Sequence, residues 1–467
     1  MSTIAKSFRE NYIAEPAFYQ KLGRIVFPIV LQQILNQGAS FVDTIMVSRV
    51  GGVSAVAVAT QLDWLLGPVT FGVNSGVNIY SSQFYGARDE KSLKKCFGFS
   101  MLMSMLIALI FFLLAALAGP AVLRFYSPDD EIVRLGWQYL RIVCVGYLFS
   151  SVTSAFTFAY RSVQRTKIPM YIGFGVNIIN ACLNYMLIFG KLGMPQMGVA
   201  GAALATVVAN ACGALAHVIY GVSTHQPFMG TFREMTDWSR AFLTPIIRRM
   251  LPLIANEALF GFGNSMYMKA YGLLGGSAIE IYKIGNTVGS FFFTAAMGMN
   301  NAAGLLVGEQ LGKKDLAGAK KCVRCLFPVS AALAILVFLL ITVTAGPLVS
   351  LFGLTDEAIR AGAVMMVRLF AIRIGFRLFN VIFMSTIRAG GDSYFLMFLD
   401  CGVVWLVGVP LAFFAVKTLG VTSITTLYAL IQAEQLVRML LGIFRYRQGK
   451  WCRNLTDETR EKAPQEA

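Results

Sequence analysis

A polar stripe that includes a carboxylate lies within an apolar segment near the start of the chain. Its members recur at the spacing of one helix face: Gln33, Asn36, Gln37, Ser40, Asp43 and Thr44. An acid at the centre of a membrane costs roughly 2.5 to 3.5 kcal/mol, so this face must meet a cavity or a partner. We interpret Asp43 as an ion-coupling site whose occupancy biases two conformations. The competing interpretation is a carboxylate that caps a neighbouring helix near the outer surface.

A second stripe consists of amides, because Asn177, Asn180 and Asn184 lie at i, i+3 and i+7. Amide stripes within apolar segments most often hydrogen-bond one helix to another. By spacing alone, these residues therefore predict contact between helices.

Three arginines, Arg368, Arg373 and Arg377, interrupt a later apolar segment. Together they would cost roughly 8 to 10 kcal/mol in lipid, more than the surrounding apolar residues return. Arg373 and Arg377 share a helix face with Asn380, and that face must meet water, an acid or a bound solute. The available acids are Glu257, Glu280, Asp400 and Glu434, of which we prefer Glu257. Either a structural ion pair with Glu257 or a basic pocket for an anionic or zwitterionic solute would account for the arginines.

The composition requires a membrane protein. Of 467 residues, 56% are hydrophobic and 14% charged, with a mean hydropathy of +0.64, whereas soluble chains carry about 25% charged residues. Phosphate-binding loops, nucleophile elbows and clusters of metal ligands are absent from the sequence, so we expect neither an enzyme nor a metal site.

Twelve apolar stretches are long enough to cross a bilayer, which takes about 20 residues each. They run approximately over 22–47, 53–80, 97–123, 132–160, 168–189, 197–222, 246–274, 278–307, 323–349, 357–387, 394–416 and 419–444. With the N-terminus inside, 27 basic residues fall on the cytoplasmic side and six on the other. This asymmetry explains the net charge of +16 without nucleic acid, and it predicts a multi-pass protein of the plasma membrane with both termini cytoplasmic.

The chain is an internal duplication. Pro28 and Gly51-Gly52 return as Pro252 and Gly275-Gly276, a shift of 224, and later landmarks recur at shifts of 226 and 227. Each half holds six spans, so the halves are parallel repeats, which is the plan of an alternating-access transporter. We expect an all-α fold of two pseudo-symmetric six-helix lobes at 1–222 and 246–444, with a cytoplasmic linker at 223–245 and a cytoplasmic tail at 445–467.

Several motifs, in this order and at repeat spacing, resemble the multidrug and toxic compound extrusion (MATE) transporters. They are Phe41-Val42-Asp43-Thr44-Ile45-Met46-Val47 with Gly51-Gly52, the loop from Gln83 to Asp89, the run from Asn180 to Leu187, Gly201-Ala202-Ala203-Leu204-Ala205-Thr206, and Arg388-Ala389-Gly390-Gly391-Asp392. The resemblance covers nearly the whole chain.

The resemblance implies roles for particular residues. Similar family members place an Asn and an Asp four residues apart on the fifth span, and a Thr on the sixth, around the coupling cation. The matching positions here are Asn180, Asn184 and Thr206, so the second acid is missing. Because a hard cation such as Na⁺ prefers carboxylate oxygens, this favours proton coupling through Asp43. Asp63 is an acid outside the family pattern and could substitute for the missing second acid.

The resemblance also predicts antiport, in which a small organic solute or drug leaves the cell against inward flow of H⁺ or Na⁺ as the lobes rock. A monomer in the lipid bilayer would suffice, with no cofactor beyond the coupling ion. Typical family substrates are lipophilic cations, which an arginine-rich pocket would repel. The alternative is therefore a flippase or exporter of an anionic or lipid-linked metabolite. We expect substrate contacts from Gln37, Asp63, Glu257, Arg373 and Arg377.

Overall fold

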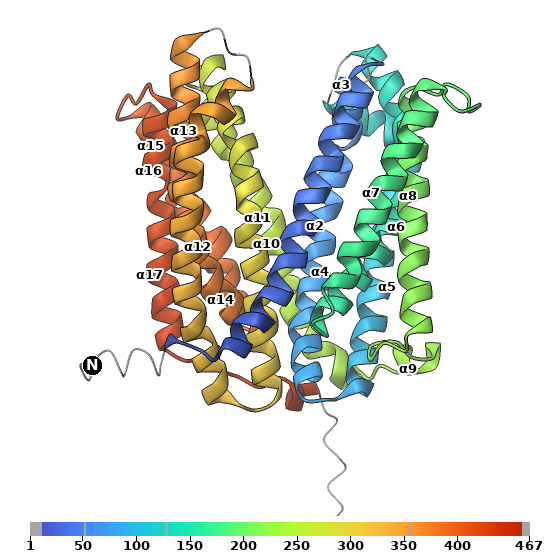
Figure 1. Ribbon diagram of the computed structural model, residues 1–467, viewed down its shortest axis with the longest axis vertical. Coiled ribbons are helices and arrows are strands. Elements are labelled where there is room, and N and C mark those ends of the chain that lie inside the picture. Colours follow the sequence, from blue (N-terminus) through green and yellow to red (C-terminus); the bar gives the residue numbers. More distant parts are fainter. Residues whose placement is uncertain (1–11, 51–52, 127–128, 353, 355, 460–467) are drawn as a thin grey trace, which may run out of the picture. The chain divides into compact units, whose positions relative to one another are not determined.

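The computed structural model describes residues 12–50, 53–126, 129–352, 354 and 356–459, and almost all of them are helical (Figure 1). The helices of the first half are α2 (Pro16–Ser48), α3 (Val53–Ala59), α4 (Gln61–Gly86), α5 (Glu90–Tyr126), α6 (Asp130–Ser162), α7 (Lys167–Phe189), α8 (Val199–Ser223) and the short α9 (Phe232–Thr236). Those of the second half are α10 (Arg240–Gly272), α11 (Gly276–Gly312), α12 (Leu316–Ser350), α13 (Glu357–Ala389), α14 (Ser393–Met397), α15 (Val409–Lys417), α16 (Ile424–Ile431) and α17 (Ala433–Arg447). Two π-helical turns, Phe398–Gly402 and Val404–Gly408, join α14 to α15.

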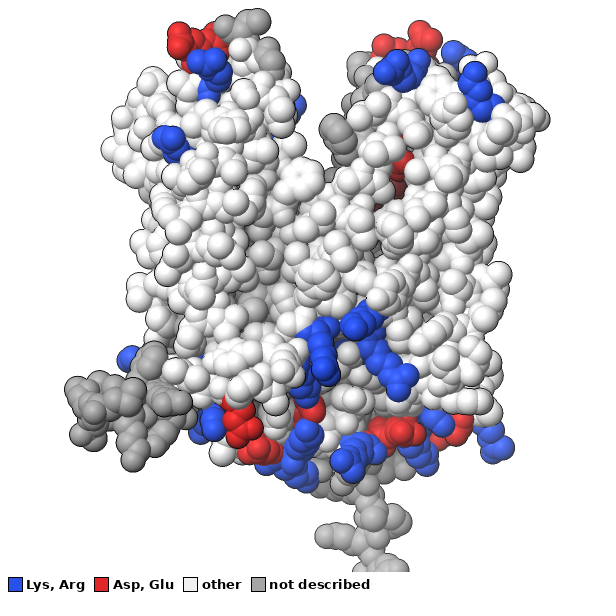
Figure 2. All heavy atoms as spheres, viewed as in Figure 1, with Lys and Arg blue, Asp and Glu red and all other residues white. Residues whose placement is uncertain are grey.

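Helices occupy each of the twelve stretches that the sequence predicts to be spans. Ten segments of the described chain are long and apolar enough to cross a membrane, counting α3 with α4, α14 with α15 and α16 with α17. The other two are α10 and α13, which are 33 residues long but more highly charged. In the view of Figure 2, the charged side chains of each part gather toward its two ends, with a mostly uncharged band between them.

Repeat-related aspartates begin equivalent helices in the two halves. Asp129 accepts hydrogen bonds from the backbone of Glu131 (2.8 Å) at the start of α6, and Asp356 accepts from Ala358 (2.8 Å) at the start of α13. Such caps satisfy backbone N–H groups that have no partner within the helix. Because the two aspartates are 227 residues apart, the duplication read from the sequence is visible in the local structure.

The chain forms two compact units, and two helices are divided between them. Of the described residues, the C-unit, as we name it, contains those up to Val30 and those from Ala255 to Thr459, and the N-unit contains those within Leu31–Ile254. The division falls two residues after Pro28 in α2 and two residues after Pro252 in α10. Proline removes a helical hydrogen bond and favours a kink, which makes these positions suitable boundaries. The two units are therefore not contiguous in the sequence. The first half of α2 belongs to the C-unit, and the first half of α10 belongs to the N-unit; we call these the exchanged halves.

Each exchanged half-helix packs on a glycine of its unit. In the N-unit, a Cβ at Gly72 would lie 2.8 Å from the Cα of Ile254, so only glycine permits this approach of α4 to α10. In the C-unit, a Cβ at Gly298 of α11 would overlap the side chain of Val30. These two contacts are related by the repeat, since the glycines are 226 residues apart and their partners 224.

Ion pairs and a hydrogen bond also hold each exchanged half-helix in its unit. Lys21 of α2 contacts Glu309 at the end of α11, with 2.6 Å between Nζ and Oε2. Lys313 contacts the other oxygen of the same carboxylate, also at 2.6 Å. In the N-unit, Arg249 of α10 donates to the hydroxyl of Tyr80.

The described part of the predicted tail is packed against the C-unit. Trp451 and Leu455 are buried, and the Trp451 indole donates to the backbone oxygen of Tyr446 (3.1 Å). A Cβ at Gly390 would overlap the backbone of Trp451, so the segment after α17 closely covers the end of α13.

Candidate functional site

The two polar stripes of the first half meet in the N-unit. Asn177 of α7 donates to Asn36 of α2 at 3.0 Å, and Asn184 donates to Asp43 Oδ1 at 2.7 Å. Both pairs are 141 residues apart, so the faces run alongside one another in register. The expected contact between helices is therefore confirmed, and the carboxylate lies at one of its ends.

Asn180 and Thr206 complete the cluster around Asp43, which we call the amide cluster (Asp43, Asn180, Asn184 and Thr206). Asn184 also donates to Asn180 Oδ1 at 3.1 Å, and Asn180 lies 3.4 Å from the Thr206 hydroxyl. With its amide turned, Asn180 donates to both oxygens of Asp43 at 2.9 and 3.1 Å, which satisfies the network better. Within the described residues, Asp43 accepts from side-chain amides rather than capping a helix.

Only one charged side chain belongs to the amide cluster. Three neutral residues surround the half-buried Asp43, and Asn184 Oδ1 is buried without a hydrogen-bond partner. A buried acceptor without a donor is costly, so a proton or a cation beside it would be stabilised. The cluster can therefore exchange one positive charge. Gln37 lies six residues before Asp43 on the same helix.

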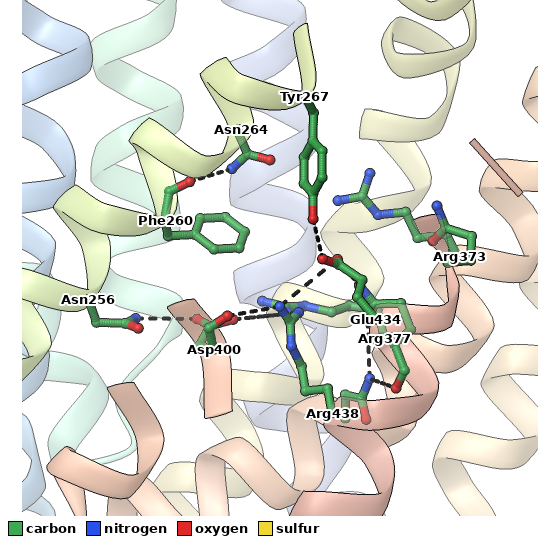
Figure 3. A network of polar contacts seen from close by, with 12 residues as sticks. Asn256, Phe260, Asn264, Tyr267, Arg373, Arg377, Asp400, Glu434 and Arg438 are labelled. Carbon is green, nitrogen blue, oxygen red and sulfur yellow. Dashed lines mark hydrogen bonds and ion pairs between the residues drawn. The ribbon is translucent and has the colours of Figure 1, made fainter. Parts of the chain in front are cut away.

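The C-unit holds a denser network in which charges pair with charges (Figure 3). Asp400 lies 3.7 Å from Arg377 Nη1 and 3.5 Å from Arg438 Nη1. Arg438 also lies 4.0 Å from Glu434, and Asn256 donates to Asp400 at 3.3 Å. We call Arg377, Asp400, Glu434 and Arg438 the ionic network.

The ionic network is balanced and buried. It contains two guanidinium groups and two carboxylates, with exposed side-chain fractions of 1% for Arg438, 7% for Asp400 and 6% for Glu434. Buried charges persist only when they are paired and hydrogen-bonded, and removing one member of a buried pair typically costs about 3 to 5 kcal/mol. The network is built to hold α13, α17 and the turn of Asp400 together.

Local backbone geometry makes room for this network. Asp400 lies in the first π-helical turn, and π-turns often occur at functional positions. Gly408 ends the second π-turn, where a Cβ would overlap the hydroxyl of Tyr267 and lie 2.5 Å from Glu434 Oε2. Tyr267 donates its hydroxyl to that carboxylate. A glycine at 408 is therefore needed for the Tyr267 to Glu434 contact.

The prediction that Glu257 is the partner of the arginines was wrong. Arg377 pairs with Asp400, and Arg373 donates to the hydroxyl of Tyr428 at 3.1 Å. Glu257 lies within electrostatic reach of Arg377 and Arg388 but forms no salt bridge among those of the described residues. The π-helical turn explains the difference, because it rotates Asp400 relative to the positions of an ordinary α-helix.

Arg373 stands apart from the ionic network. In Figure 3 no dashed line joins it to the labelled carboxylates, and none of the described acids lies within salt-bridge distance of it. Its guanidinium lies 5.8 Å from the ring centroid of Phe370 and 6.0 Å from that of Tyr428. Aromatic faces attract a cation without neutralising it. Arg373 thus forms no salt bridge within the described residues, although Glu434 lies within its electrostatic reach.

Sequence reasoning missed several members of the site. Asn256, Tyr267, Tyr428 and Arg438 each contact a charged group of the C-unit. Arg438 could have been found, because it lies four residues after Glu434 within a predicted span, the spacing of a helical ion pair. Asn380, expected on the face of Arg373 and Arg377, does point inward and donates to Gln435 at 3.1 Å.

Two pseudo-symmetric helical lobes with ionisable groups between their spans define the class of membrane transporters built from repeats. Comparison with known proteins agrees. The MatE family model matches residues 28–186 and 252–414. YoeA of Bacillus subtilis, a probable multidrug resistance protein, is 24% identical over 86% of this chain and 87% of its own. NorM of Thermotoga maritima, also described as a probable multidrug resistance protein, is 24% identical over 95% and 96%.

Solved structures show the same fold. A variant of the Vibrio cholerae MATE transporter VcmN superimposes with a TM-score of 0.85 at 16% identity, covering 94% of this chain and 98% of that one. A MOP superfamily transporter from Pyrococcus furiosus, described as having a binding pocket of reverse polarity, gives 0.83 at 18% identity, covering 92% and 96%. The chain belongs to the MatE family of membrane transporters. The predicted all-α fold of two six-helix lobes is confirmed.

Proposed function

We propose that this protein exports small organic solutes by cation antiport, with Asp43 as the coupling carboxylate. The observation that carries the proposal is the 2.7 Å hydrogen bond between Asn184 and Asp43 within an otherwise neutral cluster. A carboxylate held only by neutral donors can gain or lose one positive charge without leaving an opposite charge unpaired. The family, and relatives named as multidrug resistance proteins, support export of drug-like solutes.

The coupling ion that we propose is H⁺. Na⁺ binds best where several carboxylate or carbonyl oxygens converge, and the amide cluster offers one carboxylate. A proton on Asp43 removes the negative charge to which the amides of Asn184 and Asn180 donate. The contact between α2 and α7 then weakens, and the balance between two conformations shifts.

The path of α2 supports alternating access. The part of this helix that carries Asp43 belongs to the N-unit, whereas the part before Leu31 belongs to the C-unit. A change at Asp43 therefore acts on a helix that both units share. We propose that the units rock between inward-open and outward-open states, in a monomer of the plasma membrane with both termini cytoplasmic.

Transport into proteoliposomes tests the proposal. Ethidium, a cation, and fluorescein, an anion, would be followed separately under an imposed pH or Na⁺ gradient, in wild type and in Asp43→Asn. We expect the pH gradient to drive movement of at least one of the two dyes, and Asp43→Asn to abolish that movement. Glu280→Gln, which removes an exposed carboxylate of α11, is the control and should transport normally. Movement driven by Na⁺ alone would overturn proton coupling, and unchanged transport by Asp43→Asn would overturn the role of Asp43.

A second candidate function is export of an anionic solute, with a lipid-linked metabolite as one form of it. The observation that favours it is Arg373, which forms no salt bridge with a described carboxylate, together with the aromatic rings of Phe370 and Tyr428 beside it. Arg377, by contrast, is occupied by Asp400.

Arg373→Ala tests this candidate. If Arg373 binds the solute, fluorescein transport is lost while the folded protein remains, and Arg368→Ala, which removes an exposed arginine of the same helix, has no effect. Loss of folded protein in Arg373→Ala would instead assign this arginine a structural role.

A further inference from the structure

Two cysteines line one cavity at the end of the C-unit where α11 connects to α12. The cavity has a volume of about 250 Å³ and is bounded by the beginning of α2 with the residues before it, the end of α11 and the first turns of α12. Both Cys322 and Cys325 of α12 belong to its lining. The lining residues Glu15, Asp315 and Lys321 are exposed, so the cavity opens to solvent.

The spacing of the two thiols suits a bridging atom better than a disulfide. Residues three apart on a helix have Cβ atoms about 5 to 6 Å apart, whereas a disulfide needs about 3.5 to 4.5 Å. A metal ion with two thiolate bonds of about 2.3 Å each spans about 4.6 Å between the sulfur atoms, which side chains at this spacing can supply. Cys322 and Cys325 are free cysteines with exposed fractions of 7% and 1%, so an ion held between them would be shielded from water.

The donor atoms decide which metal ion would fit. The described residues contain no group of three or more His, Cys, Asp or Glu side chains that could hold a metal. Zn²⁺ takes four protein ligands in structural sites and three in catalytic ones. Soft thiolates select Cu⁺, which two thiolates can hold in a linear arrangement. The pair therefore suits a soft monovalent cation and not zinc.

A lysine stands within reach of each thiol. Lys21 lies within electrostatic reach of Cys322, and Lys321 lies within electrostatic reach of Cys325. Binding of Cu⁺ by two thiols releases two protons and leaves a complex with a net charge of −1. Nearby ammonium groups stabilise such a charge, most strongly where water is excluded.

The acid within reach of Cys322 is already paired. Glu309 lies near this thiol, and its carboxylate oxygens contact Lys21 and Lys313 at 2.6 Å each. The three paired residues together carry one net positive charge, opposite to that of the complex. They therefore favour a monovalent ion, because a divalent ion between two thiolates would be neutral.

The internal duplication provides a contrast. Cys96 of α5 is the counterpart of Cys322 at the shift of 226, and it is also buried. Phe99 occupies the position that corresponds to Cys325, so the sequence carries the pair in its second half alone. A single buried cysteine behaves as a small apolar residue, which is sufficient to explain Cys96 but not the pair.

We propose that Cys322 and Cys325 bind a soft monovalent metal cation such as Cu⁺ between their two thiolates. Each thiol loses its proton to solvent, two metal–sulfur bonds form, and no atom changes its oxidation state. The site shares no residue with the amide cluster or the ionic network, and it requires neither the proposed export nor its coupling ion. In the proposed topology it faces the cytoplasm, where thiols stay reduced.

Competition for Cu⁺ tests the proposal. The purified full chain would be titrated anaerobically with Cu⁺ against bicinchoninate, a chromophoric chelator, in wild type, Cys322→Ala and Cys325→Ala. Alanine keeps a small apolar side chain and removes the sulfur. We expect one tightly bound Cu⁺ per wild-type chain. Each substitution should weaken binding by more than about 100-fold, because loss of an outer-shell partner alone typically costs about 10- to 100-fold.

Two other cysteines provide matched controls. Cys96→Ala removes the repeat-related buried thiol, and Cys452→Ala removes a thiol of the C-unit that lies outside the cavity. Both variants should bind Cu⁺ as wild type does.

X-ray absorption by copper in the loaded wild type needs no variant, and it should show two sulfur neighbours. Copper bound by nitrogen or oxygen atoms would overturn the site, as would the absence of Cu⁺ binding by wild type. Wild-type affinity in both Cys322→Ala and Cys325→Ala, or an equal loss in Cys96→Ala, would overturn it too.

Discussion

The amide cluster of the N-unit and the ionic network of the C-unit both hold carboxylates among helices, but with opposite kinds of partner. Both hold carboxylates within the membrane-spanning helices, but Asp43 is held by neutral amides and Asp400 by two guanidinium groups. Neutral partners tolerate a change in the charge of the carboxylate, whereas charged partners do not. The comparison teaches that a buried acid is free to switch only where its neighbours do not depend on its charge.

The largest effect is expected at Asp400. Asp400→Asn leaves Arg377 and Arg438 buried with Glu434 as the single carboxylate of the network, and should lower the free energy of unfolding by about 3 to 5 kcal/mol. Thermal unfolding and the yield of monodisperse protein in detergent would measure it. Stability close to that of wild type would mean that the network does not hold the C-unit together.

A smaller loss of stability is expected when Gly408 is replaced. Gly408→Ala places a methyl group against Tyr267 and Glu434, and overpacking of this kind typically costs about 1 to 3 kcal/mol. Gly375→Ala in α13 is the control, because a Cβ there meets nothing within 4 Å. The unfolding temperatures of the two variants should differ clearly. Equal values would contradict the account of the second π-helical turn.

Asp43→Asn is expected to change stability by less than about 1 kcal/mol, since its partners are neutral hydrogen-bonding groups. Transport should nevertheless be lost, as proposed above. Measuring unfolding and transport on the same preparation separates the two effects. A loss of stability as large as that of Asp400→Asn would erase the contrast between the two regions.

The smallest effect concerns acids of the linker. The backbone of Thr231 and the Lys94 side chain lower the pKa of Glu234, and the hydrogen bond and charge of Lys95 lower the pKa of Asp237. Folded-state pKa values below those of the unfolded chain stabilise the fold above the usual carboxylate pKa of about 4, and this contribution disappears as the pH falls through the lowered values. Lys95→Met should therefore unfold at a slightly lower temperature than wild type at pH 7. The difference should vanish near pH 3.

Much of the fold could be predicted because helical spans and the duplication leave direct signals in the sequence. The stripes of Asp43 and Asn184 were visible as periodic polar positions, and each was expected to meet a cavity or another helix because lipid leaves polar groups unsatisfied. That they meet each other was not predicted from the spacing. The inward face of Arg373, Arg377 and Asn380 was visible for the same reason.

The pairing of charges could not be predicted, because it depends on departures from regular helix. Asp400 reaches Arg377 from a π-helical turn, whose register no 3.6-residue pattern describes. The exchange of half-helices was hidden for another reason. The sequence repeat indicates that Gly72 and Gly298 are equivalent positions, but it does not indicate which copy of the partner helix each glycine contacts.

The exchange of the first halves of α2 and α10 sets an order for biosynthesis. A ribosome that has added Ile254 has supplied every described residue of the N-unit, so this unit can close while the rest is still being made. The segment up to Val30 emerges first, yet its packing partners begin at Ala255. The first half of α2 is therefore incompletely packed until the second half of the chain has been made. Severing the chain in its linker would leave each fragment carrying a half-helix that belongs to the other.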